Sequence, residues 1–184
     1  LNALAAIGAA DHVGVAPEIA AAALSTFQNV RRRLELRGSV ALTGGEVKVY
    51  DDFAHHPTAM RVTVGGLRRR LDQNASAPGA PRQRILAVFE PRSNTMKLGT
   101  MKAQLPWALE EADLVFGLQG DYGWSVRDAL APLGPSAVVA DSVDALVAAI
   151  VSVARPGDHV LCMSNGGFGG IHGKLLDALK ARRP

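Results

Sequence analysis

The second half of the chain alternates short apolar runs with longer amphipathic stretches. The apolar runs are not interrupted by polar residues, which is typical of strands buried on both faces. They occur at 85–89, 114–118, 137–139 and 159–163. The amphipathic stretches show helical spacing of apolar residues, and they lie at 98–112, 124–130, 143–154 and 169–180. This alternation predicts a Rossmann-like α/β fold: a mostly parallel sheet with helices on both faces.

The stretch before these runs predicts an added β-hairpin and a helix. Two β-rich segments, 34–42 and 46–53, are joined by Thr43-Gly44-Gly45, which is a hairpin signal. A helix is expected to begin at Pro57, although Gly65 and Gly66 within it each cost about 1 kcal/mol relative to alanine. Segment 74–82 has the composition of a surface loop.

The first 33 residues predict two further helices. An alanine-rich helical pattern covers 1–15, and a second pattern covers 16–27 and is started by Pro17 and Glu18. The chain begins inside the first pattern. The pattern at 1–15 therefore reads as the tail of a longer structure.

Composition excludes several classes of protein. The 184 residues are 48% hydrophobic with a net charge of +3, and the basic residues form short clusters with few aromatics between them. Such clusters do not make a nucleic-acid-binding face. No apolar run approaches the roughly 20 residues of a membrane span, and no signal peptide opens the chain. The single cysteine, Cys162, fits a reducing compartment, so a cytoplasmic protein is expected.

Candidate chemistry gathers where the second β-rich segment ends and the Pro57 helix begins. The turn reads Asp51-Asp52-Phe53-Ala54-His55-His56-Pro57. Strand ends that face helix N-termini bind phosphates and hydroxyls, and carboxylates and imidazoles suit the ribose and phosphates of a nucleotide. Asp51 and Asp52 are adjacent in a strand, so only one can face the site. No further histidine or cysteine stands at ligand spacing, and no metal held by the protein is predicted.

Two later loops carry polar residues at other strand ends. Segment 89–96 places Glu90, Arg92, Ser93 and Asn94 in a Pro-broken turn. Segment 164–174 is rich in glycine but matches neither a Walker A motif nor a dinucleotide fingerprint. Its backbone N–H groups would suit a carboxylate.

These blocks, together with Arg31-Arg32-Arg33-Leu34-Glu35 upstream, resemble the C-terminal part of Mur ligases. The four blocks occur in the family's order and cover essentially the whole chain. The resemblance implies an ATP- and Mg²⁺-dependent amide ligase of peptidoglycan recycling. Its expected substrates are UDP-N-acetylmuramate and the tripeptide L-Ala-γ-D-Glu-meso-diaminopimelate. It also implies that 1–33 is the helical tail of a central ATPase domain and the hinge, and that 34–184 is the C-terminal domain. This chain is then expected to be inactive without the N-terminal and central domains.

The resemblance also assigns site residues. It places Arg33, Asp52 and His55 at ATP, with Asp52 preferred over Asp51 because the family's aspartate stands three residues before a histidine. It places His56 near the phosphates, as the catalytic candidate. The substrate-binding candidates are Arg92, Ser93, Asn94, Ser164, Asn165 and Gly167. Arg31 and Arg32 are expected at the surface.

Two alternative functions remain open at this point. A family member that joins L-alanine to UDP-N-acetylmuramate has a similar central motif, but it carries His-Arg-Tyr-Thr-Arg in place of Arg92-Ser93-Asn94-Thr95-Met96. From a different class, the chain could be a non-catalytic nucleotide-binding module.

Overall fold

The structure, a computed structural model, describes residues 2–27, 30–74 and 82–182. It divides into two compact units, Leu1–Arg31 and Arg32–Pro184. The first unit contains two helices, α1 (Asn2–His12) and α2 (Pro17–Leu24), and neither helix buries a residue within the described part of the chain. Most of the predicted loop at 74–82 lies outside the described residues. None of the described helices is long and apolar enough to cross a membrane.

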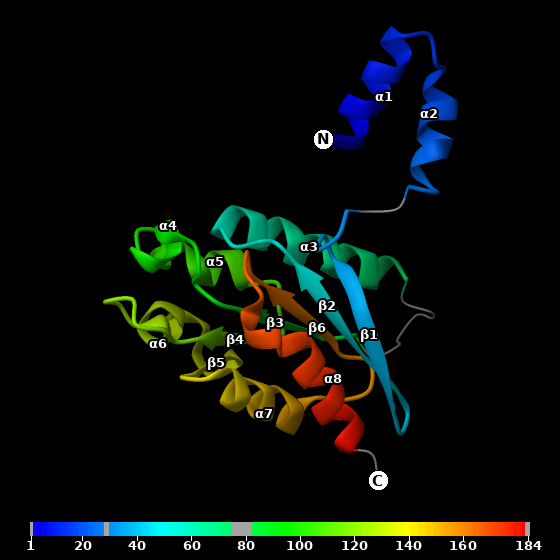
Figure 1. The fold of residues 1–184 in the computed structure, drawn as a ribbon. Coiled ribbons are helices and arrows are strands. Elements are labelled where there is room, and N and C mark those ends of the chain that lie inside the picture. The colour runs from blue at the N-terminus through cyan, green and yellow to red at the C-terminus, as the bar shows by residue number, and fades with distance from the viewer. Residues whose placement is uncertain (1, 28–29, 75–81, 183–184) are drawn as a thin grey trace. The chain divides into compact units, whose positions relative to one another are not determined.

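The second unit is built on a six-stranded sheet with the order β1-β2-β6-β3-β4-β5 (Figure 1). Strands β1 and β2 form an antiparallel hairpin, and every other neighbouring pair is parallel. The strands are β1 (Glu35–Leu42), β2 (Gly45–Asp52), β3 (Ile85–Phe89), β4 (Leu114–Leu118), β5 (Ala137–Ala140) and β6 (His159–Met163). The predicted fold class is therefore confirmed, including the N-terminal hairpin.

Helices cover both faces of this sheet (Figure 1). They are α3 (Pro57–Gln73), α4 (Asn94–Lys97), α5 (Leu105–Leu109), α6 (Val126–Leu130), α7 (Val143–Val153) and α8 (Ile171–Ala181). One core joins α3, α4, α5 and α6 to the sheet through fully buried side chains such as Leu67 and Phe89. The other core lies under α7 and α8 and includes Ile150 and Leu175.

The prediction of a single helix over 98–112 is wrong. The structure instead has α4, a short 3₁₀ turn at Lys102–Gln104, and α5. Gly99 breaks the helix because its φ of 72° lies in the left-handed region. The indole of Trp124 also packs against this backbone, and a Cβ at Gly99 would lie 2.8 Å from the ring. A side chain at position 99 would meet both obstacles.

The strand registers bring three loops to one edge of the sheet. Asp52, the last residue of β2, lies opposite Met163, the last residue of β6. Met163 also lies opposite Phe89, the last residue of β3. The loops that follow these three strands therefore begin side by side.

A buried histidine lies at the opposite end of β6. The side chain of His159 stacks on Tyr50, and its Nδ1 is 3.1 Å from the Tyr50 hydroxyl. Its Nε2 is 3.1 Å from Oε1 of Gln83. Burial, with a smaller contribution from Lys48, lowers the pKa of His159 to about 4. The imidazole is therefore neutral in the folded protein near neutral pH.

This pKa predicts a loss of stability in mild acid. The unfolded chain takes up a proton at His159 as the pH falls below about 6.5, whereas the folded protein does so only near pH 4. The free energy of unfolding should fall across this window, with a slope approaching 1.4 kcal/mol per pH unit for this one proton. Urea denaturation at several pH values should show a shallower slope for His159→Gln. His12→Gln, in the exposed helix α1, should keep the wild-type slope, and equal slopes for both variants would contradict the assignment.

Candidate functional site

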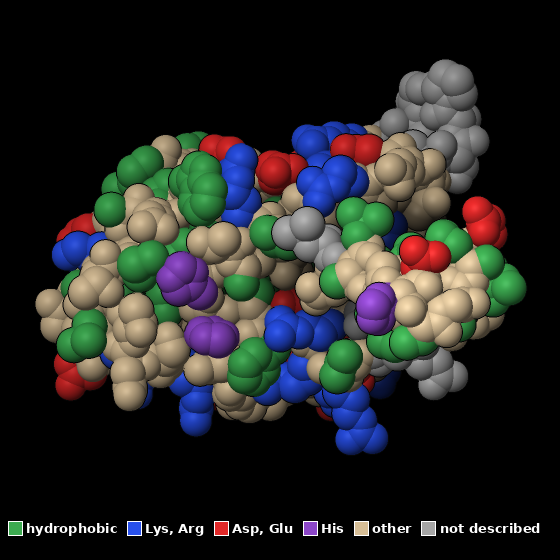
Figure 2. Space-filling view, turned by 90° about the horizontal axis from the view of Figure 1, so that it is seen from above, with side chains coloured by type: hydrophobic (Ala, Val, Ile, Leu, Met, Phe, Trp, Pro, Cys, Tyr) green, Lys and Arg blue, Asp and Glu red, His purple; other side chains and the backbone are tan. Residues whose placement is uncertain are grey.

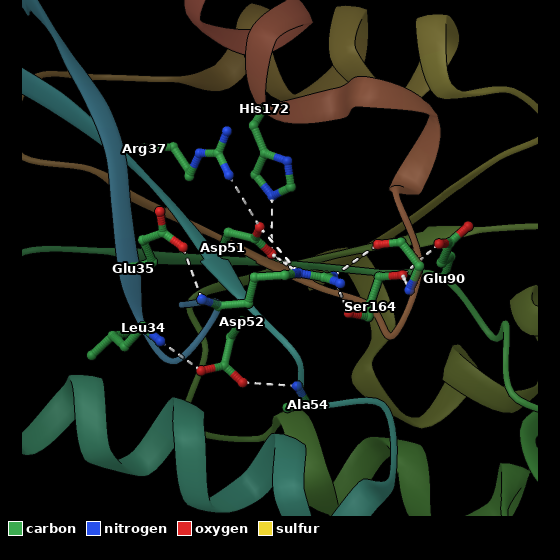
Figure 3. A network of polar contacts seen from close by, with 11 residues as sticks. Leu34, Glu35, Arg37, Asp51, Asp52, Ala54, Glu90, Ser164 and His172 are labelled. Carbon is green, nitrogen blue, oxygen red and sulfur yellow. Dashed lines mark hydrogen bonds and ion pairs between the residues drawn. The ribbon is translucent and has the colours of Figure 1, made fainter. Parts of the chain in front are cut away.

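Strand β2 ends in two carboxylates that point to opposite faces of the sheet (Figure 3). Asp52 lies toward α3, and its Oδ1 accepts a hydrogen bond from the Thr63 hydroxyl at 3.3 Å. Asp51 lies toward α8, and its Oδ1 is 3.5 Å from Nε2 of His172. Each aspartate is only 3% exposed. Neither is therefore a solvated carboxylate at a strand end.

The Asp52 carboxylate fixes the turn that follows β2. Its Oδ2 accepts a hydrogen bond from the Leu34 N–H at 2.7 Å, and its Oδ1 accepts one from the Ala54 N–H at 2.8 Å (Figure 3). With the Thr63 hydroxyl, Oδ1 has two donors, which matches its two lone pairs. Oδ2 has one donor among the residues that the structure describes, which leaves it one acceptor position. Asp52 is thus held rigidly, with one lone pair left for a further donor.

Positive and imidazole groups surround the exposed ring of Phe53. The Arg32 and Arg33 guanidinium carbons lie 5.1 Å and 5.8 Å from its ring centroid. The ring of His55 meets Phe53 edge-on with centroids 5.4 Å apart. The structure therefore brings Arg33 and His55, two predicted nucleotide residues, together at Phe53, the residue that follows Asp52. In Figure 2, seen from above the view of Figure 1, two histidine side chains lie next to each other on the left, with several basic side chains nearby.

His56 caps the N-terminus of α3. Its Nδ1 accepts a hydrogen bond from the Thr58 N–H at 3.4 Å, and Pro57 occupies the first turn. Because Nδ1 acts as an acceptor, the neutral ring carries its proton on Nε2. That N–H can donate to an anion at the helix N-terminus, where the helix dipole also favours negative charge.

The loop after β3 supplies a buried carboxylate and two exposed polar residues. Glu90 is 8% exposed, and its Oε1 accepts a hydrogen bond from the Ser164 hydroxyl at 2.5 Å. Ser93 caps α4 by accepting from a backbone N–H three residues further on, at 3.3 Å. Arg92 and Asn94 are exposed. Within the predicted set, the Ser93 hydroxyl oxygen therefore also has a structural role as a helix cap.

The loop after β6 lies directly against Arg92. A Cβ at Gly166 would lie 2.1 Å from the Nε of Arg92, so only glycine allows this approach. The Gly166 N–H donates to the Ser164 hydroxyl oxygen at 2.9 Å. The Oδ1 of Asn165 is buried and has no hydrogen-bond partner among the described residues. Gly167 is exposed. The structure thus brings Arg92 against the loop that carries Ser164, Asn165 and Gly167.

Arg32 was expected at the surface, and the structure contradicts this. Its side chain is 28% exposed, and its Nε lies 3.3 Å from the Asp51 carboxylate. Its Nη2 donates to the carbonyl oxygens of Ser164 at 2.5 Å and Gly166 at 2.8 Å. Arg31 is exposed, as expected. The run of three arginines gives no signal that separates Arg32 from its neighbours.

His172 is a second residue that the sequence did not indicate. Its side chain is 12% exposed, and its buried Nε2 has no hydrogen-bond partner within the described residues. Burial lowers the pKa of His172, and the nearby Asp51 carboxylate opposes this effect. Among the residues that the structure describes, no group of three or more His, Cys, Asp or Glu side chains could hold a metal ion.

The fold and these loops define an α/β domain whose candidate ligand site lies at the carboxyl edge of a parallel sheet. Residues 32–166 match the family model described as Mur ligase, glutamate ligase domain. The chain belongs to the Mur ligase family.

Individual relatives narrow the comparison. The chain is 51% identical over 179 residues to the UDP-N-acetylmuramate-L-alanyl-gamma-D-glutamyl-meso-2,6-diaminoheptandioate ligase of Escherichia coli (strain K12), covering 97% of this chain and 36% of the relative. It is 34% identical over 189 residues to a UDP-N-acetylmuramate-L-alanine ligase of Mycobacterium sp. (strain JLS), and the match covers 99% of this chain and 37% of that ligase. The fold is similar to the solved structure of a murein peptide ligase from Psychrobacter arcticus 273-4, with a TM-score of 0.69 and 40% sequence identity. The match covers 97% of this chain and 36% of that ligase. The chain therefore spans little more than a third of the length of these relatives.

The contacts of Asp51 predict a role in stability. Asp51→Asn removes the charge that faces Arg32, Arg37 and His172. We expect the free energy of unfolding, measured by urea denaturation, to fall by about 1 to 3 kcal/mol, because charge-assisted bonds to a buried carboxylate are lost. The matched control is Asp177→Asn, whose side chain is 80% exposed. The control should change stability by no more than about 0.5 kcal/mol, and a similar change in both variants would contradict the buried role.

Proposed function

We propose that this chain is the C-terminal part of an ATP-dependent amide ligase that joins UDP-N-acetylmuramate to L-Ala-γ-D-Glu-meso-diaminopimelate. In this proposal it supplies contacts to the nucleotide and to the tripeptide, and the enzyme works in the cytoplasm. The observation that carries the proposal is the close approach of Arg92 to Gly166 in the loop after β6. The names of the relatives at 51% and 40% identity support the choice of substrates.

The tripeptide contact follows from the chemistry of these two loops. The tripeptide carries carboxylates on its D-Glu and diaminopimelate residues. A guanidinium binds a carboxylate with two parallel hydrogen bonds and keeps its charge, which suits the exposed Arg92. The backbone N–H of Gly167 offers a further donor, and the buried Oδ1 of Asn165 accepts from an N–H of the peptide. Asn94 adds an exposed neutral polar group. The hydroxyls of Ser93 and Ser164, also predicted as substrate contacts, are engaged within the protein and would support the two loops.

The nucleotide contact follows from the turn after β2. The remaining acceptor position on Asp52 suits a ribose hydroxyl. In this proposal the Nε2–H of His56 is a donor to the phosphates. Arg33, which with His55 lies against Phe53, adds positive charge. When bound, ATP with Mg²⁺ supplies the phosphoryl group that activates the lactyl carboxylate of UDP-N-acetylmuramate toward the peptide amine. We assign the Mg²⁺ to the nucleotide phosphates.

The complete protein provides the decisive assay. It should consume ATP and form the amide product when given Mg²⁺, UDP-N-acetylmuramate and the tripeptide. L-Alanine in place of the tripeptide tests the related alanine ligase reaction, which the Arg92–Met96 sequence disfavours. ATP binding without either product would instead establish a non-catalytic nucleotide-binding module. The chain of 184 residues alone should show no turnover.

Arg92 should control the affinity for the tripeptide. Arg92→Lys keeps the charge but loses the paired hydrogen bonds, so we expect the tripeptide KM to rise about tenfold while the ATP KM stays within about twofold. Arg92→Ala should raise the tripeptide KM further. Lys97→Ala, in the adjacent helix α4, is the matched control and should leave both constants near wild type. A change confined to the ATP KM would contradict the assignment of this loop to the substrate.

Asp52 should control the affinity for ATP. Asp52→Asn keeps one acceptor oxygen, so it can still bind one of the two N–H groups of Leu34 and Ala54, and it removes the charge that strengthens a ribose contact. We expect steady-state kinetics of the complete enzyme to show an ATP KM raised ten- to a hundredfold, corresponding to about 1.5 to 3 kcal/mol. The tripeptide KM should change much less. Asp52→Ala should also lower the melting temperature, because the N–H groups of Leu34 and Ala54 lose their acceptor. An unchanged ATP KM in Asp52→Asn would confine the residue to a structural role.

A further inference from the structure

The Arg32 side chain joins two segments that are far apart in the sequence. Its Nε lies 3.3 Å from the carboxylate of Asp51 at the end of β2. Its Nη2 donates to the carbonyl oxygens of both Ser164 and Gly166, which lie in the loop after β6. One guanidinium thus binds a strand end and two backbone carbonyls of the loop at once. Figure 3 labels two of these partners, Asp51 and Ser164.

The backbone of Arg32 is fixed as well. Its N–H donates to the Glu35 carboxylate at 2.8 Å, and its carbonyl accepts from the Phe53 N–H at 2.8 Å. Arg32 has a φ of 58°, in the left-handed region that non-glycine residues rarely adopt. A residue persists in this conformation only when its surroundings hold it there. The guanidinium is therefore presented from a rigid anchor.

The two carbonyl contacts determine where the neighbouring N–H groups point. No described peptide bond is cis, and in a planar trans peptide the C=O and N–H point in opposite directions. The carbonyls of Ser164 and Gly166 turn toward Arg32, so the N–H groups of Asn165 and Gly167 turn away from it. Among the described residues, neither N–H has a hydrogen-bond acceptor. These are the donors expected to meet a carboxylate of the substrate.

We propose that Arg32 is a positioning residue that orients the N–H groups of Asn165 and Gly167 for substrate binding. This inference rests on the proposed function, because it assumes that the loop binds the tripeptide. Arg32 itself touches no substrate. It holds the loop carbonyls on one side, and the donors are then in place before the peptide arrives, which reduces the cost of ordering them on binding.

Arg37 provides a matched control. Its Nη1 lies 3.5 Å from the Asp51 carboxylate, and its side chain is 44% exposed. Arg37→Ala therefore removes a cation from the same carboxylate without removing a contact to the loop. Arg32→Lys keeps the charge, but its single ammonium lacks the planar arrangement of donors that reaches all three acceptors. It serves as a milder variant if Arg32→Ala unfolds.

The first test measures the loop directly in the chain of 184 residues. In ¹⁵N-labelled protein, Arg32→Ala and Arg32→Lys should shift or broaden the amide signals of Asn165 and Gly167. Arg37→Ala should leave these signals in place. Unchanged loop amides in both Arg32 variants, or equal shifts in Arg37→Ala, would overturn the proposal. This test does not depend on enzyme activity.

The second test uses the complete enzyme. Arg32→Lys should raise the tripeptide KM about tenfold, as expected when donors lose their alignment, while the ATP KM changes by no more than about threefold. Arg37→Ala should leave both constants close to wild type. An equal rise of both constants in Arg32→Lys would show a general structural role and overturn the proposal. Wild-type enzyme that does not ligate the tripeptide would instead refute the proposed function and leave the measurement on the loop amides intact.

Discussion

The site depends on the parallel pairing of β2 with β6. Asp52 lies opposite Met163, and the Ser164 N–H donates to the Asp52 carbonyl at 3.1 Å. Because of this bond, the first residue of the loop after β6 lies next to the first residue of the turn after β2. On its other side β6 pairs with β3, which brings in the loop that carries Arg92. A one-residue slip in either register would turn the side chains to the opposite faces, and the three loops would no longer share one site.

The alternation of side chains along β2 gives its two carboxylates different roles. Asp52 faces α3 and fixes the turn that carries Phe53 and His55. Asp51 faces α8 and binds Arg32, which in turn holds the loop after β6. Two adjacent residues therefore connect the candidate nucleotide turn and the candidate peptide loop to the same strand. Displacement of this strand would affect both.

The strands could be predicted because their apolar runs record burial on both faces. The runs at 85–89, 114–118 and 159–163 match β3, β4 and β6 residue for residue. The prediction of one helix over 98–112 was wrong because the spacing of apolar residues contains no information on the left-handed backbone at Gly99 or on the Trp124 ring packed against it.

The site could be predicted in part, for a related reason. Its loops follow strand ends, and a parallel sheet brings such ends together. Arg32 could not be found in this way, because its partners Asp51, Ser164 and Gly166 lie 19, 132 and 134 residues along the chain. The contact of Arg92 with Gly166 likewise becomes visible only when the two loops are placed in three dimensions.

The polar groups of the loop after β6 indicate what kind of ligand it suits. The Ser164 hydroxyl both donates to Glu90 and accepts from Gly166. The Oδ1 of Asn165, one residue on, is buried without a donor among the described residues. A buried acceptor in this state costs about 1 to 3 kcal/mol, and a ligand that supplies a donor removes that cost. The phosphates of a nucleotide offer mainly acceptors at neutral pH, whereas a peptide brings N–H donors together with carboxylates. An unpaired acceptor on Asn165, next to outward-facing backbone donors and Arg92, therefore fits a peptide better than the phosphates of a nucleotide.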